Sequence, residues 1–475
     1  MRTSNQAFLK VVFDEHENVT VCDVASLGLL GLETLCLHAT VMRLRWSGGV
    51  LLSVAAAYYV YTPLPSAVSE PWKLILLDAL FRSFIHAGDA AQALGVCHSV
   101  HMLNSVVSRL EVIEPWSSPT VRVTDSALGG VPARVFQPVG GGAKLRRGVL
   151  YFHGGGWALG SGRMRSYDLL CRRMAEELDT VVVSVDYRLA PDSVFPDQYH
   201  DALAASRAFL SPEVLQRFGV NPARVGVSGD SSGGNLAAAV AQRVHTCKLA
   251  HTHTLTHINT HTLTFFFWPQ ISADDSMSVK FSIQALIYPV LQALDLNTPS
   301  YQQNHNVPIL HRHLMARFWL IYLGADPSLL PHLLSSPSSL LHPSISPSIR
   351  SHLNWTSLLA AKHQKHYRPV GIETGSREVT GIVPGLVDVR AAPLLAEQGI
   401  LGRTPRAYVM TCEFDVLRDD GLMYARRLQD AGVTVTSVHY DDGFHGCMVF
   451  SFWPFLSSVG QRSLDNYIQW LDHNL

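Results

Sequence analysis

One five-residue stretch, Gly-Asp-Ser-Ser-Gly at residues 229–233, constrains this chain more than any other. The short apolar run before it, residues 224–228, predicts a buried strand, and the Gly/Ala-rich run after it, residues 234–240, predicts a closely packed helix. A G-x-S-x-G pattern between a strand and a helix is typical of a sharp turn that presents a nucleophilic serine. We therefore predict that Ser231 is a nucleophile. The alternative interpretation is a Gly/Ser loop that caps an ordinary helix.

A second glycine-rich motif, His-Gly-Gly-Gly-Trp, follows another predicted strand at residues 149–152. Acyl transfer needs backbone N–H donors where the tetrahedral oxyanion forms, and consecutive glycines let the backbone approach a substrate closely. The first choices for these donors are Gly155 and Gly156, with Ser232 as the third; the alternative is a flexible glycine turn. The full predicted sets are an oxyanion hole of Gly154, Gly155, Gly156 and Ser232, and motif residues His153, Trp157 and Asp230.

Asp415 and His445 follow two further predicted strands, residues 408–411 and 434–439. The order serine, acid, histidine is the one expected for this kind of nucleophile turn. His445 would take the proton of Ser231 and return it to the leaving alcohol, while Asp415 would fix the histidine tautomer and stabilise the imidazolium. Four other aspartates are rival candidates for the acid, and we expect them to be solvated loop charges: Asp419, Asp420, Asp441 and Asp442. His439 is a rival candidate for the base, but it lies within a predicted strand.

Composition excludes several other functions. The 475 residues are 47% hydrophobic and 16% charged, which predicts a large core with additional apolar surface. A net charge of −1 gives no electrostatic argument for nucleic-acid binding. The seven cysteines have no Cys-x-x-Cys spacing, so the sequence predicts neither a metal site nor a cofactor, and it assigns no disulfide pairing.

An uncharged run at residues 46–69 suggests a membrane segment. Its apolar core is shorter than the roughly 20 residues that a spanning helix needs, but Trp46 and three tyrosines extend it as an aromatic belt would. Arg43 and Arg45 precede the run, so the positive-inside rule predicts a cytosolic N-terminus and a lumenal remainder. The alternatives are a buried core helix and a cleaved signal peptide.

A lumenal remainder would expose one N-glycosylation sequon, Asn354-Trp-Thr, to modification. A second sequon at Asn18 would lie on the cytosolic side and stay unmodified.

Three motifs carry a family resemblance: residues 153–157, residues 186–191 (Asp-Tyr-Arg-Leu-Ala-Pro) and residues 229–235. They resemble the hormone-sensitive lipase branch of the α/β-hydrolases, and within it the arylacetamide deacetylase group. The resemblance runs from about residue 42 to residue 475, with one insertion. It implies an α/β-hydrolase fold, that is, a mostly parallel sheet with helices on both faces and a helical cap. It also implies a Ser231–Asp415–His445 triad and an uncleaved type II signal anchor in the endoplasmic reticulum membrane.

The resulting organisation has an atypical extension at 1–45, an anchor at 46–64 and a hydrolase domain at 65–475. The cap would comprise the first helices of that domain and residues 300–370. Residues 245–273 form an insertion containing a His/Thr tract (residues 251–262). Such tracts can bind metal, but a low-complexity surface insertion is the preferred interpretation.

These features predict a membrane-anchored serine esterase that hydrolyses lipid esters; the resemblance suggests cholesteryl esters or 2-acetyl monoalkylglycerol ethers. The expected partners are the lipid ester and the membrane, without nucleic acid. One alternative is a broad arylacetamide deacetylase or carboxylesterase for foreign compounds. Another is a non-catalytic binding protein on the same fold, although such proteins usually lack a member of the triad.

Overall fold

A computed structural model describes residues 49, 51, 53–140, 144–246, 277–335, 345–369, 379–452 and 454–475. Contacts divide the chain into two units, residues 1–63 and residues 64–475. The predicted extension at 1–45, most of the insertion and the whole His/Thr tract lie outside the described residues.

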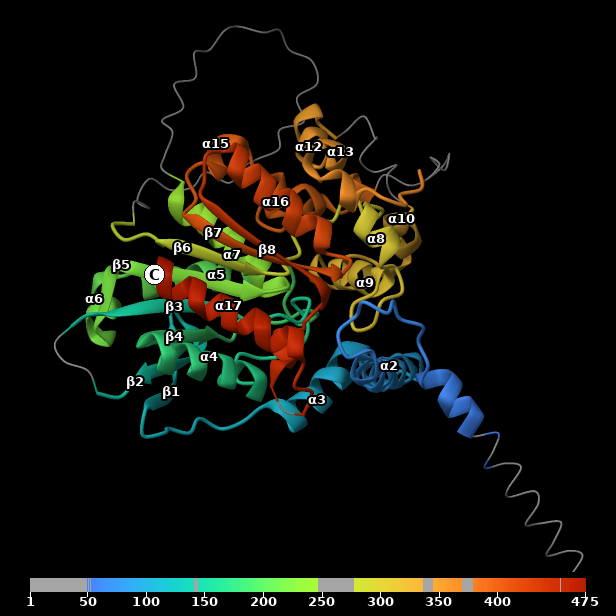
Figure 1. The fold of residues 1–475 in the computed structure, drawn as a ribbon, viewed down its shortest axis with the longest axis horizontal. Helices are drawn as coiled ribbons and strands as arrows, with labels where there is room; N and C mark the ends of the chain where they lie inside the picture. Colours follow the sequence, from blue (N-terminus) through green and yellow to red (C-terminus); the bar gives the residue numbers. More distant parts are fainter. Residues whose placement is uncertain are drawn as a thin grey trace, which may run out of the picture. The chain divides into compact units, whose positions relative to one another are not determined.

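The larger unit contains one eight-stranded sheet in the order β1-β2-β4-β3-β5-β6-β7-β8 (Figure 1). The β1–β2 and β2–β4 pairs are antiparallel, and every other pair is parallel. This is the mostly parallel sheet that the sequence predicts. The strands are β1 (Val121–Leu128), β2 (Val131–Pro138), β3 (Arg146–Phe152), β4 (Thr180–Val185), β5 (Val220–Asp230), β6 (Ile283–Ile287), β7 (Arg406–Phe414) and β8 (Val435–Phe444).

Helices connect the strands and cover the sheet. The longer helices are α2 (Pro71–Ala93), α3 (Ser99–Glu111), α4 (Arg165–Leu178), α5 (Asp197–Phe209), α6 (Pro212–Phe218), α7 (Ser232–His245), α9 (Arg312–Tyr322), α16 (Arg418–Asp430) and α17 (Ser458–Asn474). The short α-helices are α8 (Pro299–Gln303), α10 (Leu330–Leu334), α12 (Pro347–His352), α13 (Trp355–Leu358), α14 (Val379–Ile382) and α15 (Gln398–Leu401). The 3₁₀ turns are η1 (Pro327–Leu329), η2 (Ala361–His363), η3 (Pro384–Val387), η4 (Pro393–Leu395) and η5 (Val449–Ser451).

Local signals set the bounds of several helices, and α6 is the clearest case. The Ser211 hydroxyl accepts a hydrogen bond from the N–H of Val214, and Pro212 occupies the first turn, where its missing N–H costs nothing. Gly219 ends the helix in the left-handed conformation, which glycine adopts without strain. The chain then enters β5, the strand that leads to Ser231.

Alternate residues of the central strands point into two hydrophobic cores. On β3, Leu150 and Phe152 belong to the core on the side of α5 and α7, whereas Val149 and Tyr151 belong to the core on the side of α4 and α17. All four side chains are fully buried, and each such burial stabilises the fold by about 1.5–3 kcal/mol. Both faces of the sheet are therefore covered, and the carboxyl ends of its parallel strands are left as the place for a site.

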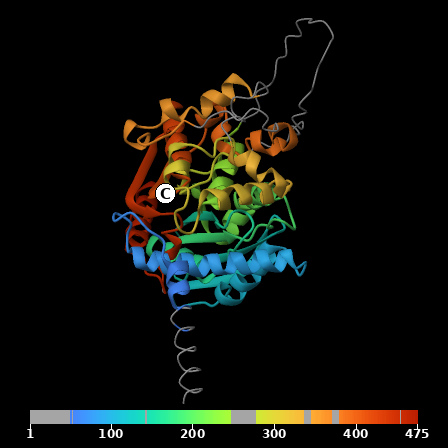
Figure 2. The same ribbon diagram turned by 90° about the vertical axis from the view of Figure 1, so that its right-hand side faces the viewer.

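Segments predicted to form the cap pack together beside this edge. Arg317 of α9 forms an ion pair with Asp89 of α2 at 2.7 Å, and the N–H of Ile309 donates to Asp78 of α2 at 2.9 Å. Figures 1 and 2 agree in placing α2 beside α9. The helices after Pro71 and the segment after residue 300 thus form one layer, while the assignment of that layer as a cap stays a prediction.

In the smaller unit, residues 53–60 are helical. Among the residues that the structure describes, no helix has both the length and the apolar character needed to cross a membrane.

Candidate active site

Ser231 lies on the turn between β5 and α7, as the sequence predicts. Its backbone has φ 53° and ψ −119°, a strained conformation for a residue with a side chain. The turn requires glycine at position 229, because a Cβ there would overlap the backbone of Gly233. Ser231 is 8% exposed. The local sequence therefore fixes the serine in a raised, strained position at the edge of the sheet.

The structure brings Ser231, His445 and Asp415 into one chain of hydrogen bonds. His445 Nε2 lies 3.0 Å from Ser231 Oγ, and His445 Nδ1 lies 2.8 Å from Asp415 Oδ2. Asp415 is fully buried, and its Oδ1 accepts a hydrogen bond from the N–H of Leu417 at 2.8 Å. Because the carboxylate accepts the proton on Nδ1, Nε2 is left to accept the serine proton. These three residues are the predicted triad, in nucleophile–base–acid geometry.

Two of the predicted oxyanion-hole glycines follow the end of β3. Gly155 and Gly156 both have positive φ, 114° and 62°, which glycine adopts at no steric cost. Ser232 is the first residue of α7, so its N–H has no partner within the helix. The positive end of the helix dipole at this point also favours a developing negative charge.

Gly154 corrects the prediction. Its N–H donates to the Tyr167 hydroxyl at 2.9 Å and to Asp230 Oδ1 at 3.0 Å, so it is not a free oxyanion donor. Asp230 also accepts hydrogen bonds from the hydroxyls of Tyr151 and Tyr167, at 3.0 and 3.2 Å. Burial raises the pKa of Asp230 to about 6, against these hydrogen bonds, which lower it. The motif aspartate thus ties the glycine loop to the nucleophile turn.

The aromatic ends of the glycine motif are packing residues. The His153 ring stacks on Tyr187 at 4.4 Å between ring centroids, and its Nδ1 lies 2.7 Å from the carbonyl oxygen of Gly154. Trp157 is fully buried and stacks on Tyr322 of α9 at 4.1 Å. Both rings hold the loop by stacking, and Trp157 links it to α9.

The rival acids do not reach His445, but two of them are not the solvated charges that the sequence suggests. Asp419 and Asp420 are fully buried. Asp419 binds Arg418 at 3.0 Å, and Asp420 accepts the N–H of Leu291 at 2.9 Å. Both aspartates lie in the first turn of α16, where negative charge is favoured.

The remaining rivals all lie on β8. Asp442 forms a surface ion pair with Arg462 at 2.6 Å, and the Asp441 side chain is 89% exposed. His439 lies within β8, as predicted, and its Nε2 is 3.0 Å from Glu413 Oε2. Glu413 and His439 form a group of potential metal ligands with His363. This group was not recognised from the sequence because the three positions are far apart in the chain.

An apolar pocket adjoins the glycine loop. It lies between α2, α3 and α9, and its apolar lining includes Phe81, Ile85, Leu103, Leu159, Leu314 and Phe318. Phe318 also reaches the loop, because a Cβ on Gly156 would lie 2.6 Å from Phe318 Cγ. An apolar surface therefore begins directly beside one of the predicted oxyanion donors.

Comparison with known proteins identifies relatives along most of the chain. The family model of the alpha/beta hydrolase fold matches residues 149–340 and 339–449. Neutral cholesterol ester hydrolase 1 of Bos taurus is 47% identical over 425 residues, covering 89% of this chain and 98% of the relative. Arylacetamide deacetylase of Mus musculus is 42% identical over 431 residues, covering 90% and 98%.

Solved structures give the same fold. An esterase of Pyrobaculum calidifontis superposes with a TM-score of 0.53 at 25% identity, covering 82% of this chain and 97% of that one. A thermostable carboxylesterase from a metagenomic library superposes with a TM-score of 0.53 at 26% identity, covering 79% and 97%.

Proposed function

The chain belongs to the alpha/beta hydrolase fold family and is a serine carboxylic-ester hydrolase, and we propose that its substrates are lipid esters cleaved through an acyl-Ser231 intermediate. The observation that carries the mechanism is the continuous hydrogen-bond chain from Ser231 through His445 to Asp415.

The reaction follows from this geometry in two halves. Ser231 Oγ attacks the ester carbonyl carbon while its proton passes to His445 Nε2, and the N–H groups of Gly155, Gly156 and Ser232 receive the oxyanion. The bond from carbon to the alcohol oxygen then breaks, and the alcohol leaves with the proton from Nε2. Water attacks the acyl-serine with its own proton passing to Nε2. Finally, the carboxylic acid departs and the serine recovers its proton.

Two observations favour a lipid ester. The pocket beside Gly156 is small, but it is lined mainly by apolar side chains, so the surface next to this predicted donor favours an apolar ester over a polar one. A relative that is 47% identical is named neutral cholesterol ester hydrolase 1. Arylacetamide deacetylase is the second candidate, since a relative of that name is 42% identical over a similar length.

Parallel assays separate these candidates. We expect the purified enzyme to hydrolyse cholesteryl oleate or an acetyl ether lipid with a higher kcat/KM than an arylacetamide. Ser231→Ala should abolish all three activities and the labelling by a fluorophosphonate probe, without unfolding the protein. A preference for the arylacetamide would overturn the lipid assignment, whereas undiminished labelling of folded Ser231→Ala would overturn the mechanism.

Residues 46–64 are proposed as a type II signal anchor that places the hydrolase in the lumen of the endoplasmic reticulum. The support is the uncharged run at 46–69 with Arg43 and Arg45 before it. The first helix of the larger unit adds to it: α2 exposes an apolar stripe along one side, formed by Trp72, Leu76 and Leu80. Such a stripe suits contact with a lipid surface.

Glycosylation tests this topology. Asn354 is exposed and directly precedes α13, so its side chain is accessible for modification. We expect an endoglycosidase to shift the mass of the membrane-expressed protein, Asn354→Gln to remove the shift, and the control Asn18→Gln to keep it. Protease access to the C-terminus in intact microsomes would reverse the proposed orientation.

A further inference from the structure

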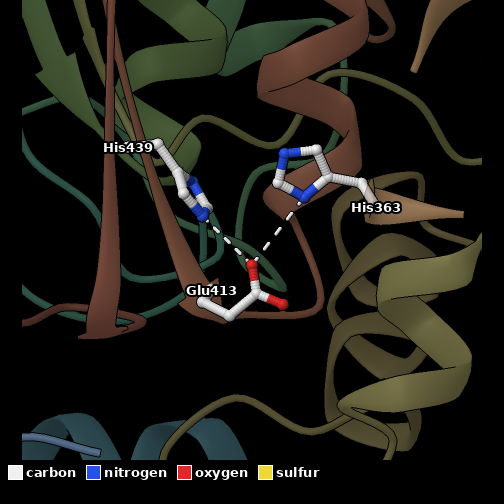
Figure 3. A group of neighbouring side chains, drawn as sticks. All are labelled: His363, Glu413 and His439. Atoms are coloured by element: carbon white, nitrogen blue, oxygen red, sulfur yellow. Dashed lines mark hydrogen bonds and ion pairs between the residues drawn. The ribbon is translucent and has the colours of Figure 1, made fainter. Parts of the chain in front are cut away.

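Three potential metal ligands meet beside the candidate active site although the reaction does not use them. His363 ends η2, Glu413 lies near the end of β7, and His439 lies on β8 (Figure 3). Their ligand atoms all lie within 4.8 Å of one another. Glu413 Oε2 is 3.0 Å from His439 Nε2 and 3.8 Å from His363 Nδ1, so both imidazoles point at the same carboxylate oxygen (Figure 3).

The surroundings prepare these atoms to bind a cation. His439 Nδ1 lies 2.9 Å from the Thr411 hydroxyl, a partner of the kind that commonly orients a metal-bound histidine. The His363 side chain is buried, and its Nδ1 is the ring nitrogen that faces the Glu413 carboxylate.

The carboxylate is also held ready. Glu413 Oε1 accepts a hydrogen bond from Arg418 Nη1 at 2.7 Å, which leaves Oε2 for the histidines. The Arg418 charge is itself opposed by Asp419 at 3.0 Å. Lys362 is exposed, so water screens its charge.

We propose that His363, Glu413 and His439 bind a divalent transition-metal ion of the zinc type. Two imidazoles and one carboxylate form a nitrogen-and-oxygen set that zinc prefers and that magnesium and calcium do not. The fourth position is open, and either water or the exposed carboxylate of Asp441, 3.5 Å from His439 Nε2, fills it. Ligand atoms around tetrahedral zinc lie about 3.3 Å apart, so the two distances to Glu413 Oε2, 3.0 Å from His439 Nε2 and 3.8 Å from His363 Nδ1, need to change only slightly when the ion binds.

The ion would join segments that also carry the candidate triad. Glu413 precedes Asp415 by two residues, and the Asn304 side-chain amide donates to the carbonyl oxygens of both, at 2.9 and 3.0 Å. His439 lies on the strand that leads to His445. Metal binding therefore fastens the segment that ends at His363 to the strands behind the acid and the base. Its effect is on stability, and the ion takes no part in acyl transfer.

Thermal unfolding of the metal-free full chain with added zinc tests the site. The His/Thr tract is a competing ligand, so the experiment uses a background protein in which the four tract histidines, at positions 251, 253, 257 and 261, are replaced by asparagine. We expect zinc at about a hundredfold excess over its Kd to raise the Tm of this protein by roughly 3 °C, and magnesium to leave it unchanged.

Three single variants of the background protein identify the ligands: His363→Gln, Glu413→Gln and His439→Gln. Each should lose the zinc-induced rise and the visible absorption that cobalt(II) gives in a tetrahedral site. His352→Gln is the matched control, because His352 is also buried and lies 3.8 Å from Glu397, and among the described residues it belongs to no comparable group of ligands. It should keep both signals. A folded background protein without a zinc-induced rise, or folded ligand variants that all keep it, would overturn the proposal.

Discussion

Asp415→Asn tests the acid through a detail of its hydrogen bonding. One oxygen of the carboxylate accepts the N–H of Leu417 at 2.8 Å, and the other accepts His445 Nδ1 at 2.8 Å. An asparagine has only one acceptor oxygen. If that oxygen stays with the Leu417 N–H, the amide NH₂ must face Nδ1, and His445 then carries its proton on Nε2, where it cannot accept the proton of Ser231.

The alternative amide orientation is also costly. It restores the correct tautomer but points the NH₂ group at the Leu417 N–H, leaving a buried donor unpaired at a cost of about 1–3 kcal/mol. We therefore expect the wrong tautomer to dominate and kcat to fall on the order of 10⁴-fold, with little change in KM. The melting temperature should change little, because the favoured orientation keeps both heavy-atom contacts.

The assay is steady-state hydrolysis of a short acyl ester, with the labelling rate of a fluorophosphonate probe as a second readout. Asp442→Asn is the control, since Asp442 pairs with Arg462 at the surface, and it should retain full activity. If Asp419→Asn stays folded and loses as much activity while Asp415→Asn does not, the acid has been misassigned.

Further predictions concern buried groups and the insertion. Burial raises the pKa of Asp420 to about 7, whereas an unfolded aspartate has a pKa of about 3.9. The folded state therefore binds the additional proton between these values, and the Tm of the wild type relative to Asp420→Asn should fall as the pH rises through this window; a rise would contradict the assignment. Cys412 and Cys447 are buried with their sulfurs 3.7 Å apart, and burial raises the pKa of the Cys412 thiol, so peptide mapping should find both unalkylated until the protein is denatured. Deleting residues 247–273 should leave short-ester hydrolysis and Tm unchanged or improved, because loop-closure entropy depends only weakly on length; a folded but inactive deletion variant would make the insertion functional.

Local patterns were sufficient to place the three candidate triad residues, because each of them directly follows a recognisable strand. An apolar run and the turn after it are adjacent in sequence, so Ser231, Asp415 and His445 could each be placed at the end of a strand. The parallel order of β5, β6, β7 and β8 then brings those ends to one edge. The strands themselves extend further than the apolar patterns indicate: β8, for example, continues to Phe444.

Burial of charge was the least predictable property. Asp419 and Asp420 stand among polar residues that are typical of a solvated loop, yet both lie in a buried helix turn. Their partners, Ser300 and Leu291, come from the segment after β6, more than a hundred positions earlier in the chain. No periodicity within a short window carries that information, since the pairing is created by the packing of α16 against the segment after β6.

The role of Gly154 could not be predicted from the sequence motif alone. Three consecutive glycines look equivalent in sequence, and each could supply an oxyanion donor. In the fold, the first N–H is taken by Asp230 and Tyr167, and only the following two turn toward positive φ and escape such pairing among the described hydrogen bonds. The three glycines differ for a physical reason. The loop that supplies the donors must itself be held in place, and the glycine nearest β3 is the one that reaches the Asp230 carboxylate. The aspartate of one motif thus positions the donors of the other, a dependence that neither motif reveals alone.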